Sequence, residues 1–201
     1  MRISVLNMKG GVGKTTTTVY LCAAAAAAGV HPVIAVDADP QGSLADWLGE
    51  RPIPGVELVD APAARLVEAA AAQACEGLMI IDTPPQVELI LRAAIAHSDF
   101  ALIPTGTGSP TPARVATTLT LLPPTLSRGL IVTAARTGTR HLTETVLGWQ
   151  AAGERILGVV PLRVGIEAGP AQPELDRTGR IAYAAILEAM VDQLVGASAN
   201  A

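Results

Sequence analysis

Short apolar runs rich in β-branched residues alternate along the whole chain with longer stretches of helical composition. Within each run the apolar residues are continuous, which is typical of strands buried on both faces of a parallel sheet. The alternation of strands and helices predicts a doubly wound α/β fold, a single mostly parallel sheet with helices on both faces. In such a fold, ligands bind beyond the carboxyl ends of the strands.

The predicted elements follow directly from these runs. The expected strands are 3–6, 33–37, 78–82, 100–104, 130–133 and 156–160. The expected helices are 15–28, 63–73, 87–97, 112–122, 141–152 and 178–194. Because neither an internal repeat nor a long linker divides the chain, we expect one domain over residues 1–195. The small polar residues 196–201 are expected to fray.

Composition excludes several classes of protein. Half of the 201 residues are hydrophobic and 16% are charged, as in a soluble globular domain. The longest apolar run, 19–30, is shorter than the roughly 20 residues that span a bilayer, and no signal segment precedes the glycine loop. We therefore expect a cytoplasmic protein. Cys22 and Cys75 lack metal-ligand spacing, which predicts two buried, reduced thiols.

The use of basic residues is uneven. The net charge is −4, so any contact with nucleic acid requires a local basic patch. The basic residues number 14, and all of them except Lys9 and Lys14 are arginine. In a chain that otherwise replaces lysine with arginine, these two positions indicate a need for a compact ammonium group rather than a planar guanidinium.

Both lysines belong to a glycine loop between the first expected strand and the first expected helix, Lys9-Gly10-Gly11-Val12-Gly13-Lys14-Thr15-Thr16. This context is that of a P-loop, whose backbone N–H groups and helix N-terminus cradle phosphate oxygens. We expect residues 10–16 to bind the nucleotide, with Lys14 on the outer phosphates and the Thr15 hydroxyl on Mg²⁺. A Rossmann loop is excluded because Thr16 stands where its third glycine is required.

Three carboxylates follow expected strands. Asp82 ends a strand of four apolar residues, where a charge is costly unless a cation such as Mg²⁺ binds beside it. Asp37 and Asp39 precede Pro40 and belong either to the same site or to a simple turn cap.

These motifs resemble those of one family. The loop resembles the deviant Walker A loop of the ParA/MinD ATPases, with Lys9 as the additional lysine. Residues 37–42 (Asp-Ala-Asp-Pro-Gln-Gly) resemble its switch I motif, and residues 78–85 resemble Walker B with the switch II turn. The resemblance covers essentially the whole chain and is greatest to the small ParA partition proteins.

The resemblance implies roles for individual residues. Lys9 would reach the partner's phosphates across a nucleotide-sandwich dimer, so that Lys9, Lys14 and Asp39 form the catalytic set. Asp39 would orient the attacking water. Asp37 would support the metal site formed by Thr15 and Asp82.

Later segments also match the family. Pro161 and Arg163 would lie near the adenine, although Ile166 stands where members often carry an aromatic residue. Residues 109–112 (Ser-Pro-Thr-Pro) resemble a segment at the dimer interface, or form only a helix-start turn. No guanine-reading Asn-Lys-x-Asp motif is present, because the chain has no further lysines.

By this resemblance the chain is a DNA-partition ATPase with ATP and Mg²⁺ as cofactors and slow basal turnover. It would form a homodimer on ATP, bind DNA non-specifically through arginines such as Arg163 and Arg177, associate with the nucleoid, and respond to a ParB-like centromere-binding partner. The alternatives are a MinD-like membrane-surface regulator and a metabolic ATPase of the same superfamily. A membrane-surface helix needs a cationic face, whereas the last helix carries Glu188 and Asp192.

Overall fold

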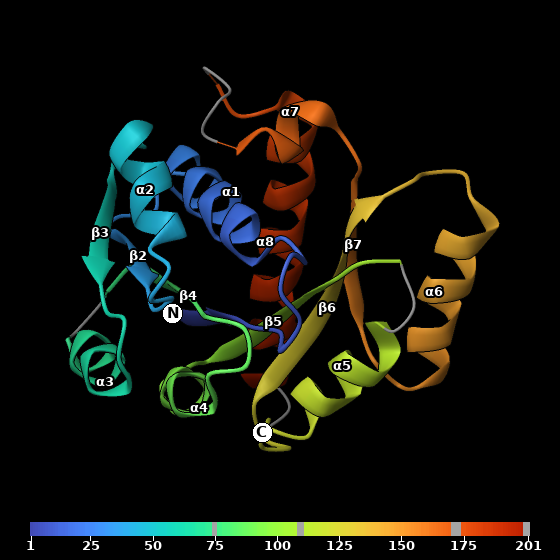
Figure 1. The fold of residues 1–201 in the computed structure, drawn as a ribbon, viewed down its shortest axis with the longest axis horizontal. Coiled ribbons are helices and arrows are strands. Elements are labelled where there is room, and N and C mark those ends of the chain that lie inside the picture. Colours follow the sequence, from blue (N-terminus) through green and yellow to red (C-terminus); the bar gives the residue numbers. More distant parts are fainter. Residues whose placement is uncertain (74–75, 108–110, 170–173, 199–201) are drawn as a thin grey trace.

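The computed structural model describes residues 1–73, 76–107, 111–169 and 174–198. A seven-stranded sheet with the order β3-β2-β4-β1-β5-β6-β7 runs through the molecule, and every pair of neighbouring strands is parallel (Figure 1). The strands are β1 (Arg2–Val5), β2 (Val33–Asp37), β3 (Val56–Asp60), β4 (Leu78–Asp82), β5 (Phe100–Thr105), β6 (Ser127–Ala135) and β7 (Ile156–Pro161).

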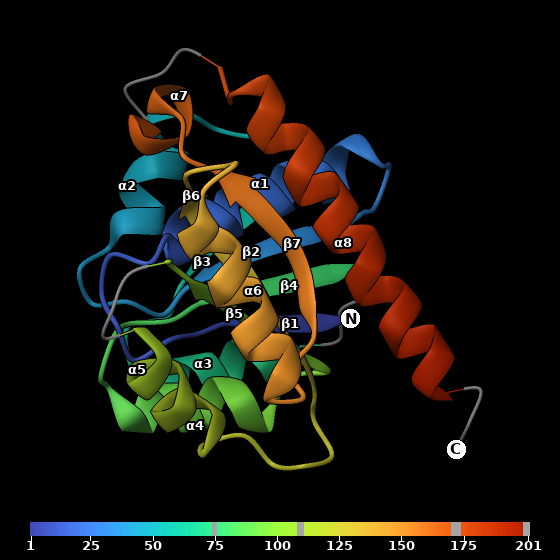
Figure 2. The ribbon, with the colours of Figure 1, turned by 90° about the vertical axis from the view of Figure 1, so that its right-hand side faces the viewer.

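Helices cover both faces of this sheet, which confirms the predicted doubly wound fold (Figures 1 and 2). One face carries α1 (Lys14–Ala27), α2 (Ser43–Glu50), α7 (Val164–Glu167) and α8 (Arg177–Ser198). The other face carries α3 (Ala64–Ala72), α4 (Glu88–Ala96), α5 (Thr111–Leu119) and α6 (Arg140–Ala151). On the first face the rings of Tyr20 and Tyr183 stack with their centroids 5.1 Å apart, joining α1 to α8.

Two elements between β2 and β4 are absent from the sequence prediction. The structure forms the short helix α2 and the strand β3 there, and β3 pairs with β2 alone at the edge of the sheet. Glu57 and Asp60 of β3 are exposed, and Leu58 keeps 39% of its surface in contact with solvent. An edge strand has no second neighbour to bury it, so the continuous apolar run used for the other strands does not arise.

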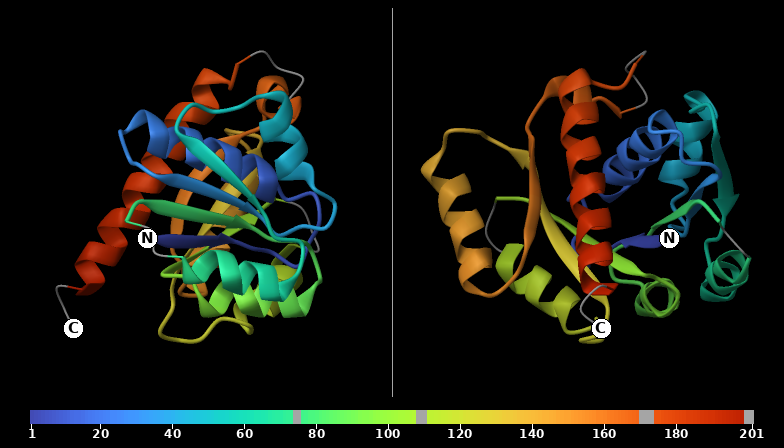
Figure 3. Two further views of the ribbon diagram at one scale, coloured as in Figure 1. Left: turned by 90° about the vertical axis from the view of Figure 1, so that its left-hand side faces the viewer. Right: turned by 180° about the vertical axis from the view of Figure 1, so that it is seen from behind.

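The ends of several elements also differ from the expected limits. α8 continues to Ser198 instead of ending at residue 194, so Gly196 belongs to this helix. The last turns of α8 extend past the sheet (Figures 2 and 3).

Cys22 is buried as expected, and burial raises the pKa of its thiol. Cys75 and the first part of the 109–112 segment lie outside the described residues.

Candidate functional site

The ends of three neighbouring strands bring the predicted carboxylates and the glycine loop together. Asp82, the last residue of β4, lies beside Val5 of β1 on one side and beside Asp37 of β2 on the other. The chain leaves β1 directly into the loop that carries Lys9 and Lys14. The parallel register therefore places all three sequence motifs at the carboxyl ends of the strands, where such folds bind ligands.

The loop depends on glycine at two positions. Gly11 and Gly13 have φ angles of 69° and 80°, in the left-handed region that residues with a Cβ rarely adopt. Gly13 is also the N-cap of α1 and has no side chain to accept from the first N–H groups of the helix. A helix that begins in this way presents N–H donors and the positive end of its dipole to an anion.

Three polar side chains hold the loop in place, and the sequence did not reveal their role. Asn7 accepts from the N–H of Lys9 at 2.9 Å and donates to the carbonyl of Pro104 at 2.8 Å. The Thr133 hydroxyl lies 2.9 Å from the Val12 carbonyl, and the Thr118 hydroxyl accepts from the N–H of Met8 at 3.1 Å. These contacts fix the loop to β5, β6 and α5.

Lys14 lies at the base of the loop. It is 8% exposed, and its ammonium group donates to the Lys9 carbonyl at 3.3 Å. Burial lowers the pKa of this ammonium group, while the negative charges of Asp82 and Asp39 oppose that shift. A buried cation within reach of two carboxylates and a glycine loop is suited to bind a phosphate.

Thr15 and Asp82 form the part of the site that fits a divalent cation. The Thr15 hydroxyl donates to Asp82 Oδ2 at 2.6 Å, and the buried Oδ1 has no hydrogen-bond partner in the described structure. Burial raises the pKa of Asp82 to about 7. A hydroxyl beside a carboxylate with an unused, buried oxygen is the oxygen-donor set that Mg²⁺ prefers, so these residues fit the predicted ion.

The raised pKa predicts a pH-dependent stability for the ligand-free chain. Folded Asp82 keeps its proton up to about pH 7, whereas in the unfolded chain it ionises near pH 4. The folded state therefore binds more protons between these values, and stability falls as pH rises from about 4 to 7. Asp82→Asn, which cannot ionise, is expected to be more stable than the parent at pH 8 by about 2 kcal/mol or more, and equal to it only below about pH 4, where the carboxyl is protonated in both states of the parent.

Urea denaturation in the presence of a chelator, at several pH values, measures this effect. Asp60→Asn serves as the control because Asp60 ends strand β3, separated from β4 by β2 alone, but is exposed. Parallel pH profiles for Asp82→Asn and the parent would show that Asp82 is not the group responsible.

Asp37 and Asp39 have different surroundings. Both oxygens of the buried Asp37 accept backbone N–H groups, from Asp39 at 3.1 Å and from Ala45 at 2.8 Å. Burial raises the pKa of Asp37, and these hydrogen bonds act against the shift. Such contacts are those of a turn cap that also fixes the start of α2, one of the two alternatives left open by the sequence. Asp39 accepts from Gln41 through Oδ1 at 3.0 Å.

Two adjoining pockets surround the loop. The loop pocket, about 540 Å³, lies between the glycine loop, the start of α2 and the 167–169 turn; its lining includes Gly10, Lys14, Thr15, Asp39, Trp47 and Glu167. The strand-end pocket, about 350 Å³, lies beyond β6 and β7; its lining includes Val12, Thr133, Pro161, Arg163, Ile166 and Glu167. The loop pocket contains the lysine and the glycine loop, and the strand-end pocket adds the apolar side chains of Val12, Pro161 and Ile166; a nucleotide needs both kinds of lining.

The strand-end pocket contains the residues expected beside the base. Pro161 and Arg163 line it, and Arg163 is held by an ion pair with Asp176 at 3.2 Å. Ala134, which also lines this pocket, has a φ of 48°, where the register of β6 against β7 shifts. Bulges of this kind often occur beside functional sites, where they redirect the strand end.

Arg177, predicted to bind DNA, is exposed at the first position of α8.

The chain matches a known family of nucleotide-binding domains. The model of the CobQ/CobB/MinD/ParA nucleotide binding domain, CbiA, matches residues 3–175. The chain belongs to this family. Its ParA/MinD-type domain is 43% identical over 106 residues to maintenance of carboxysome distribution protein A of Gloeobacter kilaueensis, covering 51% of this chain and 48% of the relative. It is 32% identical over 136 residues to the chromosome-partitioning ATPase Soj of Thermus thermophilus, covering 51% and 53%. The chain thus spans about half the length of these curated relatives.

Solved ParA/MinD-type structures share the fold. A putative plasmid partition protein of Borrelia burgdorferi bound to AMPPNP superposes with a TM-score of 0.77 at 18% identity, over 95% of this chain and 98% of that one. The septum site-determining protein MinD of Pyrococcus horikoshii, complexed with Mg-ADP, has a TM-score of 0.77 at 20% identity, over 98% and 97%. These matches confirm the architecture predicted for a P-loop domain of this family.

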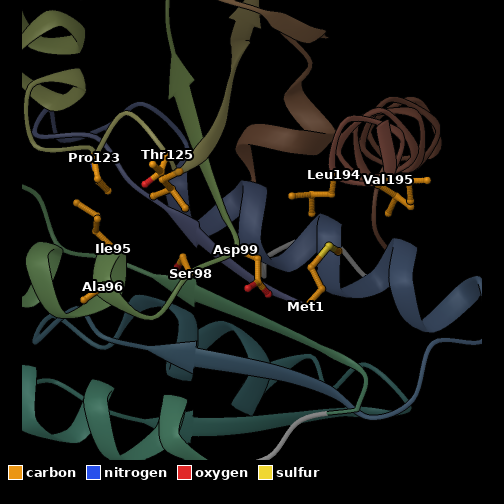
Figure 4. Close-up of a pocket in the computed structure, with 11 residues that line it drawn as sticks. Met1, Ile95, Ala96, Ser98, Asp99, Pro123, Thr125, Leu194 and Val195 are labelled. Carbon is orange, nitrogen blue, oxygen red and sulfur yellow. The ribbon is translucent and has the colours of Figure 1, made fainter. Parts of the chain in front are cut away.

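A third cavity, about 680 Å³, lies near the opposite ends of the strands (Figure 4). Met1, Ile95, Leu194 and Val195 form much of its wall, and Asp99 is its only charged side chain. Asp99 already accepts from the N–H of Arg2 at 2.7 Å. Although this cavity is larger, its lining contains neither a basic side chain nor a glycine loop, so it does not fit a nucleotide.

Among the described residues, no helix is both long and apolar enough to cross a membrane.

Proposed function

We propose that this ParA/MinD-type domain is a partition or positioning ATPase that binds ATP with Mg²⁺ and hydrolyses it slowly until a partner protein stimulates it. The observation that carries the proposal is the hydrogen bond from the Thr15 hydroxyl to Oδ2 of the buried Asp82, 2.6 Å long. It lies next to the loop that contains the only two lysines in the sequence. Binding of an ATP analogue or of Mg-ADP by the structural relatives supports the choice of ligands.

Each part of the nucleotide has a matching part of the site. The N–H groups of residues 10–16 and the Lys14 ammonium group would hold the phosphates. Thr15 and Asp82 would hold Mg²⁺, which when bound offsets the negative charge of the phosphates. The base would enter the strand-end pocket between Pro161 and Ile166. Asp39, on the wall of the loop pocket, would position the water for attack.

The biological role follows the named relatives. One relative maintains carboxysome distribution and another partitions chromosomes. We propose that ATP joins two copies of the chain, with Lys9 reaching the partner's phosphates, and that the dimer binds DNA without sequence preference at the nucleoid. Hydrolysis, stimulated by a ParB-like protein, would release it.

The charges on α8 support DNA rather than a membrane as the partner of this helix. Arg177 and Arg180 lie at its exposed N-terminal end. The rest of the helix carries Glu188 and Asp192 and no lysine or arginine. A helix that lies on an anionic membrane needs a cationic face along its length, so the MinD-like alternative has less support.

ATP-dependent DNA binding tests the proposal. We expect the chain to bind random duplex DNA with ATP but not with ADP or without nucleotide. Because arginine contacts with phosphates release counterions, log K should fall with log salt with a slope of about 0.9 per contact. Fluorescence anisotropy across a salt series measures both effects.

Two arginine variants sharpen the result. Arg177→Ala should weaken binding to all sequences and lower the slope by about 1. Arg92→Ala is the matched control, because Arg92 is an exposed arginine of α4 on the other face of the sheet and pairs with Glu88. DNA binding that does not depend on ATP, or its absence at low salt with ATP, would contradict the partition mechanism.

A further inference from the structure

The exposed residue Glu167 lies where the two pockets meet. Glu167 is the last residue of the short helix α7 and lines both the loop pocket and the strand-end pocket. The other residues that line both pockets are Gly11, Gly13 and Thr16, all from the glycine loop. Glu167 therefore stands across the site from the loop, at the passage between the phosphate side and the base side.

The surroundings of α7 hold Glu167 in this place. The N–H of Glu167 donates to the Arg163 carbonyl at 3.0 Å, and the neighbouring Ile166 is buried in the core. A Cβ atom added at Gly165 would lie 3.0 Å from the carboxylate of Asp176, so this short helix packs closely against the start of α8. On the other side of Glu167, a Cβ atom added at Gly169 would lie 3.5 Å from the Trp47 ring, so the turn is in contact with the protein both before and after Glu167.

The Glu167 side chain takes no part in the contacts that hold α7. Its carboxylate has no hydrogen-bond or ion-pair partner among the described residues, and the nearby Arg163 is instead paired with Asp176. An ionised carboxylate can only accept hydrogen bonds, and it repels phosphate oxygens. Unlike Asp82 and Asp39, which are assigned to Mg²⁺ and to the attacking water, a further carboxylate in a nucleotide site is favourable if the ligand presents hydroxyl or amino donors to it.

We propose that Glu167 accepts hydrogen bonds from the ribose hydroxyls of the nucleotide and makes the site selective for ribonucleotides over deoxyribonucleotides. This inference rests on the proposed ATPase function. The sugar is the part of ATP that joins the phosphates to the base, and Glu167 lies where the two corresponding pockets join. The base amino group is the other donor, but the base fits farther along the strand-end pocket, between Pro161 and Ile166.

Calorimetric titration with ATP, 2′-deoxy-ATP and 3′-deoxy-ATP tests the inference. Because hydrogen bonds to charged groups are the stronger ones, we expect the parent chain to bind ATP about 10-fold or more tightly than at least one of the deoxy analogues. Glu167→Ala should bring the ratio close to 1 by weakening ATP binding while leaving binding of that analogue unchanged or tighter. Glu167→Gln, which keeps the shape but not the charge, should give an intermediate ratio.

Glu174→Ala is the matched control, because Glu174 is an exposed glutamate that lines a cavity beside Arg51 and Arg180 and neither of the two pockets. It should keep the parent's ratio. Equal affinity of the parent for ATP and both deoxy analogues, or an equal loss of all three in Glu167→Ala, would overturn the sugar assignment while leaving ATP binding intact. Failure of the parent to bind any nucleotide would overturn the ATPase proposal, and the sugar assignment with it.

Discussion

Lys14→Ala is expected to lose ATP binding by about 100-fold or more, because truncating a buried group that pairs with a charge costs about 2–5 kcal/mol. Lys14 is 8% exposed, and the carboxylates of Asp82 and Asp39 lie close enough to oppose the effect of burial on its pKa. Removing its ammonium group leaves the phosphates beside those carboxylates with one positive charge fewer. Isothermal titration with ATP and Mg²⁺ measures the loss.

Lys9→Ala provides the comparison that separates the two lysines. The Lys9 backbone is fixed by Asn7, and its carbonyl accepts from Lys14, so the substitution leaves these main-chain contacts in place. If Lys9 acts across a dimer, this variant should bind ATP as a monomer but fail to dimerise and hydrolyse it. An equal loss of ATP affinity in both variants would contradict the cross-dimer role.

Asp39→Asn is expected to lower ATP hydrolysis by about 10² to 10⁴-fold, the usual contribution of general acid–base catalysis, with little change in ATP affinity. Asparagine keeps an oxygen that can accept from Gln41, so the turn is preserved while the negative charge is lost. ATP-bound protein should then accumulate as a dimer. A phosphate-release assay, together with size-exclusion chromatography, measures both results.

Two further variants complete this test. Asp39→Ala should lose hydrolysis to a similar extent, although it also removes the turn contact with Gln41. Asp46→Asn is the control, because Asp46 lines the same pocket from the first turn of α2. Normal turnover in Asp39→Asn would reduce Asp39 to a turn residue, and a similar loss in Asp46→Asn would point to the general charge of the pocket.

The architecture could be read from the sequence wherever burial imposes a local pattern. β4 is buried along its whole length. Its continuous apolar run predicted the strand and the position of Asp82 at its end. β3 was missed because it is an edge strand whose charged residues face solvent. α2 was missed because it is short, and its start is held by Asp37, a contact between residues eight positions apart.

The site shows the same division. Lys14, Thr15 and Asp82 belong to motifs whose chemistry is visible in a few consecutive residues, and the structure brings them together as predicted. The residues that hold the loop were not predicted, because Asn7 contacts Pro104 and Thr133 contacts Val12 across 97 and 121 positions. The scarcity of asparagine in this chain was the one available signal for Asn7. The role of Glu167 depends on the meeting of two pockets, which no local pattern encodes.

The positions of the two tryptophans give the chain a built-in optical probe. Trp47 of α2 lines the loop pocket, and its ring lies 3.5 Å from the position that a Cβ would occupy at Gly169. Trp149 of α6 is buried in the cluster on the opposite face of the sheet. Indole emission depends on local polarity, so a change in the summed emission on nucleotide addition would report on Trp47 in the loop pocket, while the distant, buried Trp149 would add a constant background. Occupancy of the site can therefore be followed in the unlabelled protein.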